Sequence, residues 1–99
     1  MTTILRHYRF SVNTSNLDDM IDEKVSFIKL DIEGAEYKAL LGARRIIKTY
    51  KPKLAICVYH RHDDLCRLPM LIHEMVPDYK FYLRHHHPNE WDTVLYAKI

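Results

Sequence analysis

The stretch from Val25 to Glu36 reads VSFIKLDIEGAE, and it decides how the surrounding sequence is interpreted. Its first eight residues, Val25 to Ile32, are rich in β-branched and aromatic side chains, and Glu33-Gly34 ends the run, which predicts a strand. Because the run is mostly apolar on both faces and not only at alternate positions, it indicates an interior strand.

The residues downstream of this strand predict helices alternating with a second strand. From Ala35 to Tyr50, apolar residues recur at intervals of one, three and four, the spacing of an amphipathic helix. Lys51-Pro52 ends it, because a residue before proline is disfavoured in the helical region. Leu54 to Tyr59 predicts a second apolar strand. Asp63-Asp64 then favours the start of another helix, in which Pro69 is expected to cause a kink or begin a second half.

The two ends of the chain complete the predicted fold. Tyr79–Arg84 and Asp92–Ile99 alternate in polarity around a polar loop, which predicts a β-hairpin. Near the N-terminus, Tyr8–Val12 is compatible with a strand and Leu17–Ile21 with a short helix. Strands alternating with helices predict an α/β fold with mostly parallel strands, closed here by an antiparallel hairpin.

Length and composition exclude several kinds of partner. Ninety-nine residues are enough for one domain at most. Fifteen basic and thirteen acidic residues give a net charge of +2, too little to indicate a nucleic-acid platform or a polybasic membrane anchor. No apolar run approaches the roughly 20 residues that cross a bilayer. Cys57 and Cys66 form no CxxC motif, and they predict reduced thiols in a cytoplasmic protein.

The central motif resembles the signature of a known enzyme family. Phe27 to Glu36, followed by Leu41-Gly42-Ala43, is similar to the signature of the FkbM-type methyltransferases, which use S-adenosylmethionine and have a Rossmann-like class I fold. The flanking segments resemble that family in the same order: Leu17-Asp18-Asp19, Pro52–Ile56, Tyr59-His60, Tyr79–His85 and Leu95-Tyr96-Ala97. The resemblance covers about residues 12 to 99, and it implies a methyltransferase of this class.

The resemblance also indicates which part of the enzyme this chain corresponds to. Enzymes of this family hold the cofactor mainly in their first half, with a glycine-rich turn after the first strand and an acidic residue after the second. The two glycines of this sequence, Gly34 and Gly42, lie in no glycine-rich turn. The resemblance therefore implies that residues 1–99 form a single partial domain, the C-terminal half, without the cofactor-binding half.

The implied half-domain has a consequence for partners. In the family's fold, the strand Val25–Ile32 lies beside the first strand, which has no counterpart here. An apolar strand at the edge of a sheet has unpaired backbone groups and recruits other strands. We therefore expect a homodimer or a partner chain at this edge, or a rearrangement that covers it.

Candidate site residues follow the two central strands. In open α/β sheets, ligands bind beyond the carboxyl ends of the strands. Methyl transfer requires an aligned acceptor and removal of its proton, which suits a carboxylate or an imidazole. We predict Asp31 and His60 as catalytic residues on the acceptor side. The residues predicted on the substrate or cofactor side are Glu33, Gly34, Glu36 and His62.

These residue types also have structural explanations. Asp31 is suited to cap the next helix, and negative charge at Glu33 and Glu36 is stabilised by a helix N-terminus. Gly34 suits a turn, and His60 is equally compatible with a structural imidazole. A divalent metal held by these carboxylates and histidines would match no closed ligand motif, so no metal ligand is predicted.

The resemblance implies O-methylation of a hydroxyl group on a sugar or natural-product-like acceptor. Two other classes stay open. One is a non-catalytic interaction module or subunit derived from a methyltransferase and completed by another chain. The other is a metal-binding protein that uses His85-His86-His87.

Overall fold

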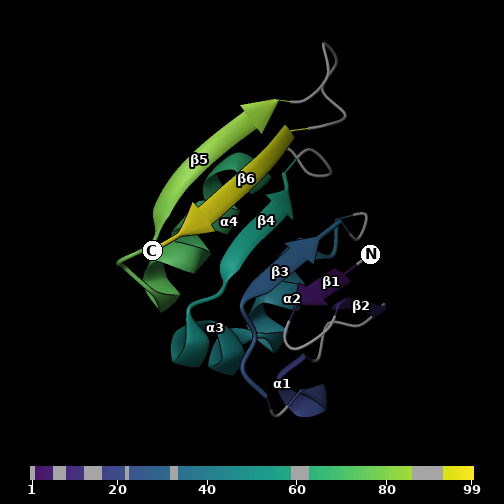
Figure 1. Cartoon of the computed structure of the whole chain (residues 1–99). Coiled ribbons are helices and arrows are strands. Elements are labelled where there is room, and N and C mark those ends of the chain that lie inside the picture. The colour runs from purple at the N-terminus through teal and green to yellow at the C-terminus, as the bar shows by residue number, and fades with distance from the viewer. Residues whose placement is uncertain are drawn as a thin grey trace.

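The computed structural model describes residues 2–5, 9–12, 17–21, 23–31, 34–58, 63–85 and 93–99. At residues 2–5, 9–12 and 64 only the backbone is described. Its strands are β1 (Thr2–Leu5), β2 (Arg9–Val12), β3 (Phe27–Leu30), β4 (Lys53–Cys57), β5 (Lys80–His85) and β6 (Thr93–Lys98). Its helices are α1 (Leu17–Met20), α2 (Glu36–Gly42), α3 (Arg44–Tyr50) and α4 (Asp64–Met75). The strands form one sheet in the order β2-β1-β3-β4-β6-β5 (Figure 1).

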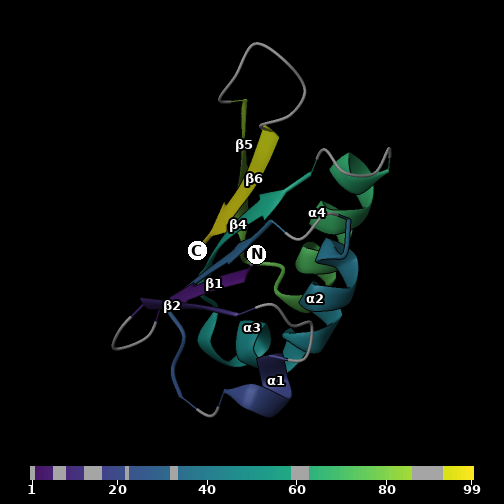
Figure 2. The ribbon, with the colours of Figure 1, turned by 90° about the vertical axis from the view of Figure 1, so that its right-hand side faces the viewer.

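The described helices all lie against the same face of this sheet. The view along the sheet in Figure 2 shows α1 to α4 on one side, with the opposite face carrying none of them. The described part of the chain is therefore a two-layer α/β arrangement. None of its helices is long and apolar enough to cross a membrane.

The predicted α/β class is confirmed, but the expectation of mostly parallel strands is wrong. Only β3 and β4 pair in parallel, whereas the other four pairings of the sheet are antiparallel. A parallel pair needs a long crossover, and α2 with α3 provides the one that separates β3 from β4. The closing hairpin is confirmed, because β5 pairs antiparallel with β6 from Lys80 opposite Lys98 to His85 opposite Thr93.

The expected free edge at β3 is covered by the chain itself. Strand β1 pairs antiparallel with β3, and Ile4 lies opposite Ile28. Of the two outcomes left open by the sequence, the structure has the rearrangement that covers this edge. Residues 2–5 were not predicted as a strand, because four residues are too few for a clear alternation.

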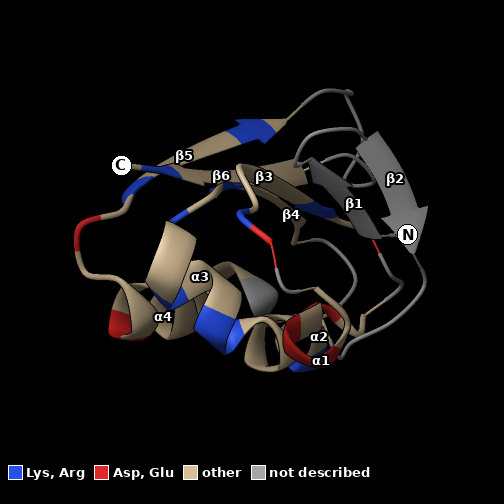
Figure 3. Ribbon diagram, turned by 60° about the horizontal axis from the view of Figure 1, so that its bottom comes forward, with Lys and Arg blue, Asp and Glu red and all other residues tan. Residues whose placement is uncertain are grey.

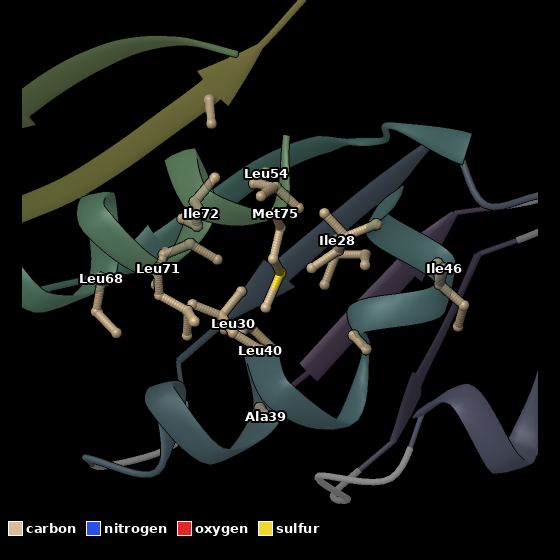
Figure 4. Packing of buried hydrophobic residues seen from close by; sticks show 14 of the residues in the cluster. Ile28, Leu30, Ala39, Leu40, Ile46, Leu54, Leu68, Leu71, Ile72 and Met75 are labelled. Carbon is tan, nitrogen blue, oxygen red and sulfur yellow. The ribbon is translucent and has the colours of Figure 1, made fainter. Parts of the chain in front are cut away.

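The main core lies between the sheet and the helices. Ile28 and Leu30 of β3 and Leu54 and Ile56 of β4 are each at most 1% exposed. All four belong to one buried cluster with residues of α2, α3 and α4, and Figure 4 shows Ile28, Leu30 and Leu54 among side chains of these helices. The prediction of an interior strand is confirmed, because β3 lies between β1 and β4. On the face opposite the helices, Phe27 is half-buried and Lys29 is exposed.

The single helix predicted from Ala35 to Tyr50 is two helices. α2 ends at Gly42, and α3 begins at Arg44 after Ala43, whose side chain cannot cap a helix. Asp18 does so instead, since its carboxylate accepts hydrogen bonds from the backbone N–H groups of Arg45 (2.8 Å) and Ile46 (3.0 Å). The Arg45 guanidinium donates in return to the carbonyls of Asp18 and Ile21, both at 2.8 Å. A cap supplied from 27 residues upstream is invisible to local sequence patterns.

Pro69 does not divide the last helix. It lies inside α4, which continues from Asp64 to Met75. The expectation that it starts a second half is therefore wrong. Proline lacks an N–H, so the helix gives up the hydrogen bond to the carbonyl four residues earlier, and packing of Leu68 and Ile72 in the core offsets that loss.

The long-range cap yields a test of what holds α3 in place. Replacing the capping residue in Asp18→Ala is expected to lower the free energy of unfolding by about 1–2 kcal/mol, since two helix N–H groups lose their acceptor. Urea denaturation followed by circular dichroism measures this. The matched control is Asp19→Ala, an exposed neighbour on the same helix, which is expected to change stability by less than about 0.5 kcal/mol. Equal losses in both variants would contradict the cap.

Candidate functional site

Asp31 lies at the carboxyl end of β3, beside the last residue of β4. Leu30 is in register with Ile56, so the next position on each strand brings Asp31 next to Cys57. The Cys57 thiol donates a hydrogen bond to the Asp31 carboxylate. The parallel pairing therefore brings together a half-buried carboxylate and a buried thiol at one edge of the sheet.

The surroundings of Cys57 keep its thiol protonated. Burial raises the pKa of Cys57 to about 12, helped by the negative charge of Asp31, its hydrogen bond to that carboxylate and the charge of Glu36. The ammonium of Lys29 acts in the opposite direction. The thiolate is the reactive form of cysteine, so Cys57 at neutral pH is a hydrogen-bond donor to Asp31 and a poor nucleophile.

A tight turn after Asp31 connects the strand to α2. Gly34 has a φ of 92°. This backbone conformation is sterically unfavourable for any residue with a Cβ atom, and glycine adopts it readily. Its N–H donates a hydrogen bond of 3.0 Å to Oε1 of Glu36, the first residue of α2. Glu36 is 1% exposed, and it is the one buried charged residue among the described side chains. The turn thus accounts for both residues structurally, and their predicted place on the substrate or cofactor side stays a prediction.

A hollow of about 390 Å³ borders Asp31 on the face of the sheet that lies opposite the helices. Lys29, from the middle of β3, contributes a cation to the wall that holds the Asp31 carboxylate. The remaining lining is mostly apolar: Phe27, Ala55, Cys57, Val94 and Tyr96. The hollow therefore offers a carboxylate and an ammonium within an otherwise apolar wall, which suits a small polar molecule.

The other predicted site residues fall elsewhere. Glu33, His60 and His62 lie outside the described residues, as do His86 and His87. His85 ends β5, and its Nδ1 lies 2.7 Å from the hydroxyl of Thr93 on β6. Within the ranges that the structure describes, no three histidine, cysteine or acidic side chains are grouped as for a metal ion.

Cys57 and Lys29 are the site residues that sequence reasoning did not place. The sequence shows Lys29 only as one cation in an apolar run, and Cys57 only as one of two cysteines without a CxxC motif. The strand register provides the signal for both. Once β3 and β4 are paired in parallel with Lys29 opposite Ala55, Cys57 must follow beside Asp31.

The fold and this edge define the class of the chain. The family model described as the methyltransferase FkbM domain matches residues 4–91, and the chain belongs to this family. Among solved structures, the crystal structure of methyltransferase FkbM from Methylobacillus flagellatus KT is 55% identical in sequence, with a TM-score of 0.80. The similarity covers 83% of this chain and 22% of that one. No curated protein matches the sequence significantly.

The identified family confirms the resemblance drawn from the central motif. The match also shows that this chain corresponds to about a fifth of the length of the Methylobacillus protein.

The two glycines provide a test of the turn. Replacing the first in Gly34→Ala forces a Cβ atom into a positive-φ backbone and is expected to cost about 1–2 kcal/mol of stability. The control is Gly42→Ala at the end of α2, where the backbone φ is not positive and alanine is the better helix former. Thermal unfolding compares the two. A larger loss at Gly42 than at Gly34 would contradict the importance of the turn.

The raised pKa of Cys57 predicts how stability changes with pH. Between roughly 8.5, the pKa of an exposed thiol, and the folded value of about 12, the unfolded chain releases a proton that the folded chain retains. Stability is therefore unaffected by this group below that window and falls within it, by at most about 1.4 kcal/mol per pH unit. Urea denaturation at several pH values should show a shallower decline for Cys57→Ala.

Alkylation provides an independent control for that prediction. The exposed Cys66 is expected to react with iodoacetamide at pH 8 in the folded chain, whereas Cys57 should react only after denaturation. Mass spectrometry of tryptic peptides distinguishes the two thiols. Rapid labelling of Cys57 in the folded chain would disprove its protection.

Proposed function

We propose that this chain forms the acceptor-side part of an S-adenosylmethionine-dependent methyltransferase with a Rossmann-like class I fold. The proposed reaction is O-methylation of a hydroxyl group on a sugar or natural-product-like acceptor. The observation that supports it most is the position of Asp31, at the end of β3 beside a small hollow, in a chain of the FkbM methyltransferase domain family. Residues 1–99 would then be a partial domain, consistent with their match to 22% of the Methylobacillus protein.

Asp31 has the chemistry required on the acceptor side. A carboxylate accepts a hydrogen bond from a hydroxyl, which orients the oxygen lone pair and increases its nucleophilicity. The buried Cys57 lies beside this carboxylate at the end of the neighbouring strand. Lys29 lines the same hollow and can donate to neighbouring hydroxyls of a polyol. His60, outside the described residues, is the proposed general base.

The described residues fit the cofactor only in part. When bound, S-adenosylmethionine supplies a methyl group activated by a sulfonium, and the negative charge of Asp31 suits that cation. The cofactor's own carboxylate and its ribose need backbone N–H donors and an acidic residue. The N–H of Gly34 is already bonded to Glu36, and neither glycine lies in a glycine-rich turn. The residues described do not form a complete cofactor site, so the role proposed for them is limited to the acceptor.

Calorimetric titration of the chain with S-adenosylhomocysteine tests whether the chain has acceptor-side residues without a complete cofactor site. We expect binding weaker than about 1 mM, because the cofactor contacts are incomplete. Micromolar binding would contradict a partial cofactor site and would call for acceptor screening with the chain alone.

A chimera tests the role of Asp31 directly. The part of the Methylobacillus flagellatus protein that aligns with this chain is replaced by it, which 55% identity makes feasible. S-adenosylhomocysteine binding and transfer of a labelled methyl group to a panel of sugars and hydroxylated compounds are then measured. In the chimera, Asp31→Asn is expected to reduce transfer by about 10²-fold or more while cofactor affinity is retained. The control is Asp78→Asn, an exposed residue paired with Lys51.

Each outcome of the chimera experiment has a definite meaning. Transfer at the unmodified rate in Asp31→Asn would disprove the acceptor role of that carboxylate. A chimera that binds S-adenosylhomocysteine but transfers no methyl group to any compound tested, with or without the substitution, would favour the non-catalytic interaction module.

A further inference from the structure

Exposed apolar side chains lie on the outer surface of the helical layer, on α2 and α4. Met70 of α4 is 71% exposed, more than any other large apolar residue that the structure describes. On α2, Leu41 follows Tyr37 by about one turn on the same side of the helix and is also exposed. The two helices are in contact and lie next to each other in Figure 2. One exposed methionine is ordinary, but apolar surface that extends across two helices is typical of an interaction surface.

A hollow of about 530 Å³ borders Met70 and is bounded by both helices. Its bottom includes Leu71, which is 5% exposed. At its rim, the Arg67 guanidinium lies 4.2 Å from the centre of the Tyr37 ring, and Nη1 of Arg67 lies 3.4 Å from the Asp63 carboxylate. These two contacts hold a cation at the edge of the hollow. The described lining residues are Tyr37, Arg67, Met70, Leu71, His73 and Glu74.

Four of these lining residues form one stripe along α4. They are spaced as i, i+3, i+4 and i+7: Arg67, Met70, Leu71 and Glu74. This spacing places them on one side of the helix. The α4 stripe therefore has a cation near one end, a carboxylate near the other and two apolar side chains between them. Figure 3 shows that the helical layer as a whole also has both basic and acidic segments.

The α4 stripe is complementary to a second copy of itself. In a two-fold symmetric dimer, every contact from one copy to the other is matched by the reciprocal contact. Arg67 lies three positions before Met70, and Glu74 lies three positions after Leu71. When two α4 helices run antiparallel about an axis between positions 70 and 71, Arg67 of each copy faces Glu74 of the other. Met70 of each copy then lies over Leu71 of the other, at the bottom of the hollow.

The charges favour this arrangement over two alternatives. Parallel α4 helices would bring Arg67 next to Arg67 and Glu74 next to Glu74, which is unfavourable for like charges. A small apolar ligand would occupy the hollow but would not pair with the charges on both sides of it. Within the part of the chain that the structure describes, Glu74 forms no ion pair, so its carboxylate is available to a second copy.

The size of this surface predicts a weak dimer. Helix α4 has 12 residues and is therefore about 18 Å long. Two helices side by side, with their side chains, are roughly 20–24 Å wide, which gives a face of roughly 400 Å² on each copy. That is about half of the roughly 800 Å² per partner in a standard stable interface. We therefore expect a transient dimer with a dissociation constant of about 0.1 mM.

We propose that the α4 stripe, with Tyr37 and Leu41 of α2 beside it, is a homodimer interface in which two α4 helices pack antiparallel. This surface replaces the edge of β3, which β1 covers, as the place where a second copy associates. The proposal does not depend on methyl transfer, because none of the residues of the candidate site takes part in it.

Sedimentation velocity of the whole chain tests whether it dimerises. Between about 10 µM and 1 mM, the weight-average mass is expected to rise from 11.9 kDa toward twice that value. A chain that stays monomeric at 1 mM would overturn the proposal.

Substitution of the exposed methionine locates the interface. Met70→Asp places a charge where the dimer buries apolar surface, and is expected to weaken dimerisation by about tenfold or more. The matched control is Met20→Asp, at an exposed methionine of α1, which is expected to change the dissociation constant by less than about twofold. Circular dichroism verifies that both variants fold. Equal dissociation constants for the two variants would overturn the proposal.

Charge-reversal variants test the antiparallel arrangement. Arg67→Glu brings carboxylates face to face at both symmetric positions, and Glu74→Arg does the same with cations. Each variant alone is expected to dimerise at least about tenfold more weakly. An equimolar mixture of the two, with one of them labelled, again has opposite charges at both positions and is expected to form a heterodimer about as tight as the unmodified dimer. A mixture that associates no more tightly than either variant alone would overturn the proposal.

A second mixture controls for net charge. Lys80→Glu and Asp19→Arg make the same changes of charge at exposed residues of β5 and α1. Their mixture is expected to favour heterodimers over homodimers by less than about twofold beyond the statistical ratio. A preference as large as that of the Arg67 and Glu74 variants would show attraction between net charges alone and would overturn the proposal. Because Arg67 also contacts Tyr37, Glu74→Arg tests the same pair by itself at an exposed residue.

Discussion

The parallel pairing of β3 with β4 is the contact on which the rest of this structure depends. It requires the chain to return to the same end of the sheet, which α2 and α3 accomplish. It also aligns the carboxyl ends of both strands, so Asp31 and Cys57 meet without any other device. The antiparallel strands extend the sheet outward from this pair on either side. The arrangement of the sheet and the position of the candidate site therefore both follow from the pairing of β3 with β4.

Two polar contacts make the crossover between these strands possible. The hydrogen bond from Gly34 to Glu36 closes the turn out of β3 and buries a carboxylate at the start of α2. The Asp18 carboxylate then caps α3 where the helical path changes direction. The first contact satisfies the N–H of a turn residue, and the second satisfies backbone N–H groups that the start of α3 leaves without partners. Asp18 and Glu36, two acidic residues in segments that resemble the family, therefore stabilise the fold. The presence of an acidic residue in such a motif is not by itself evidence of a catalytic role.

Sequence patterns predicted the elements more reliably than their connections. The two central strands, the last helix and the closing hairpin were predicted because their apolar spacing is local. The Asp18 cap and the pairing of β1 with β3 were not, because they join residues distant in sequence. At the site, Asp31 could be predicted from its position after a strand. Its partner Cys57 required the register of a neighbouring strand, and Glu33, His60 and His62 lie outside the described residues.

The place of β6 in the sheet has a consequence for how the chain is made. The strand latest in the described sequence lies in the interior, between β4 and β5. Thirty-six positions separate Cys57, the end of β4, from Thr93, the start of β6. At roughly 5–20 residues per second of synthesis, one side of β4 lacks its final neighbour for about 2–7 seconds. β5 is made earlier than β6 but cannot join the sheet before it. The β4–β6 and β6–β5 pairings are therefore the last to form in this sheet. Until the residues of β6 are translated, one side of β4 has unpaired backbone groups that can pair with the wrong strand.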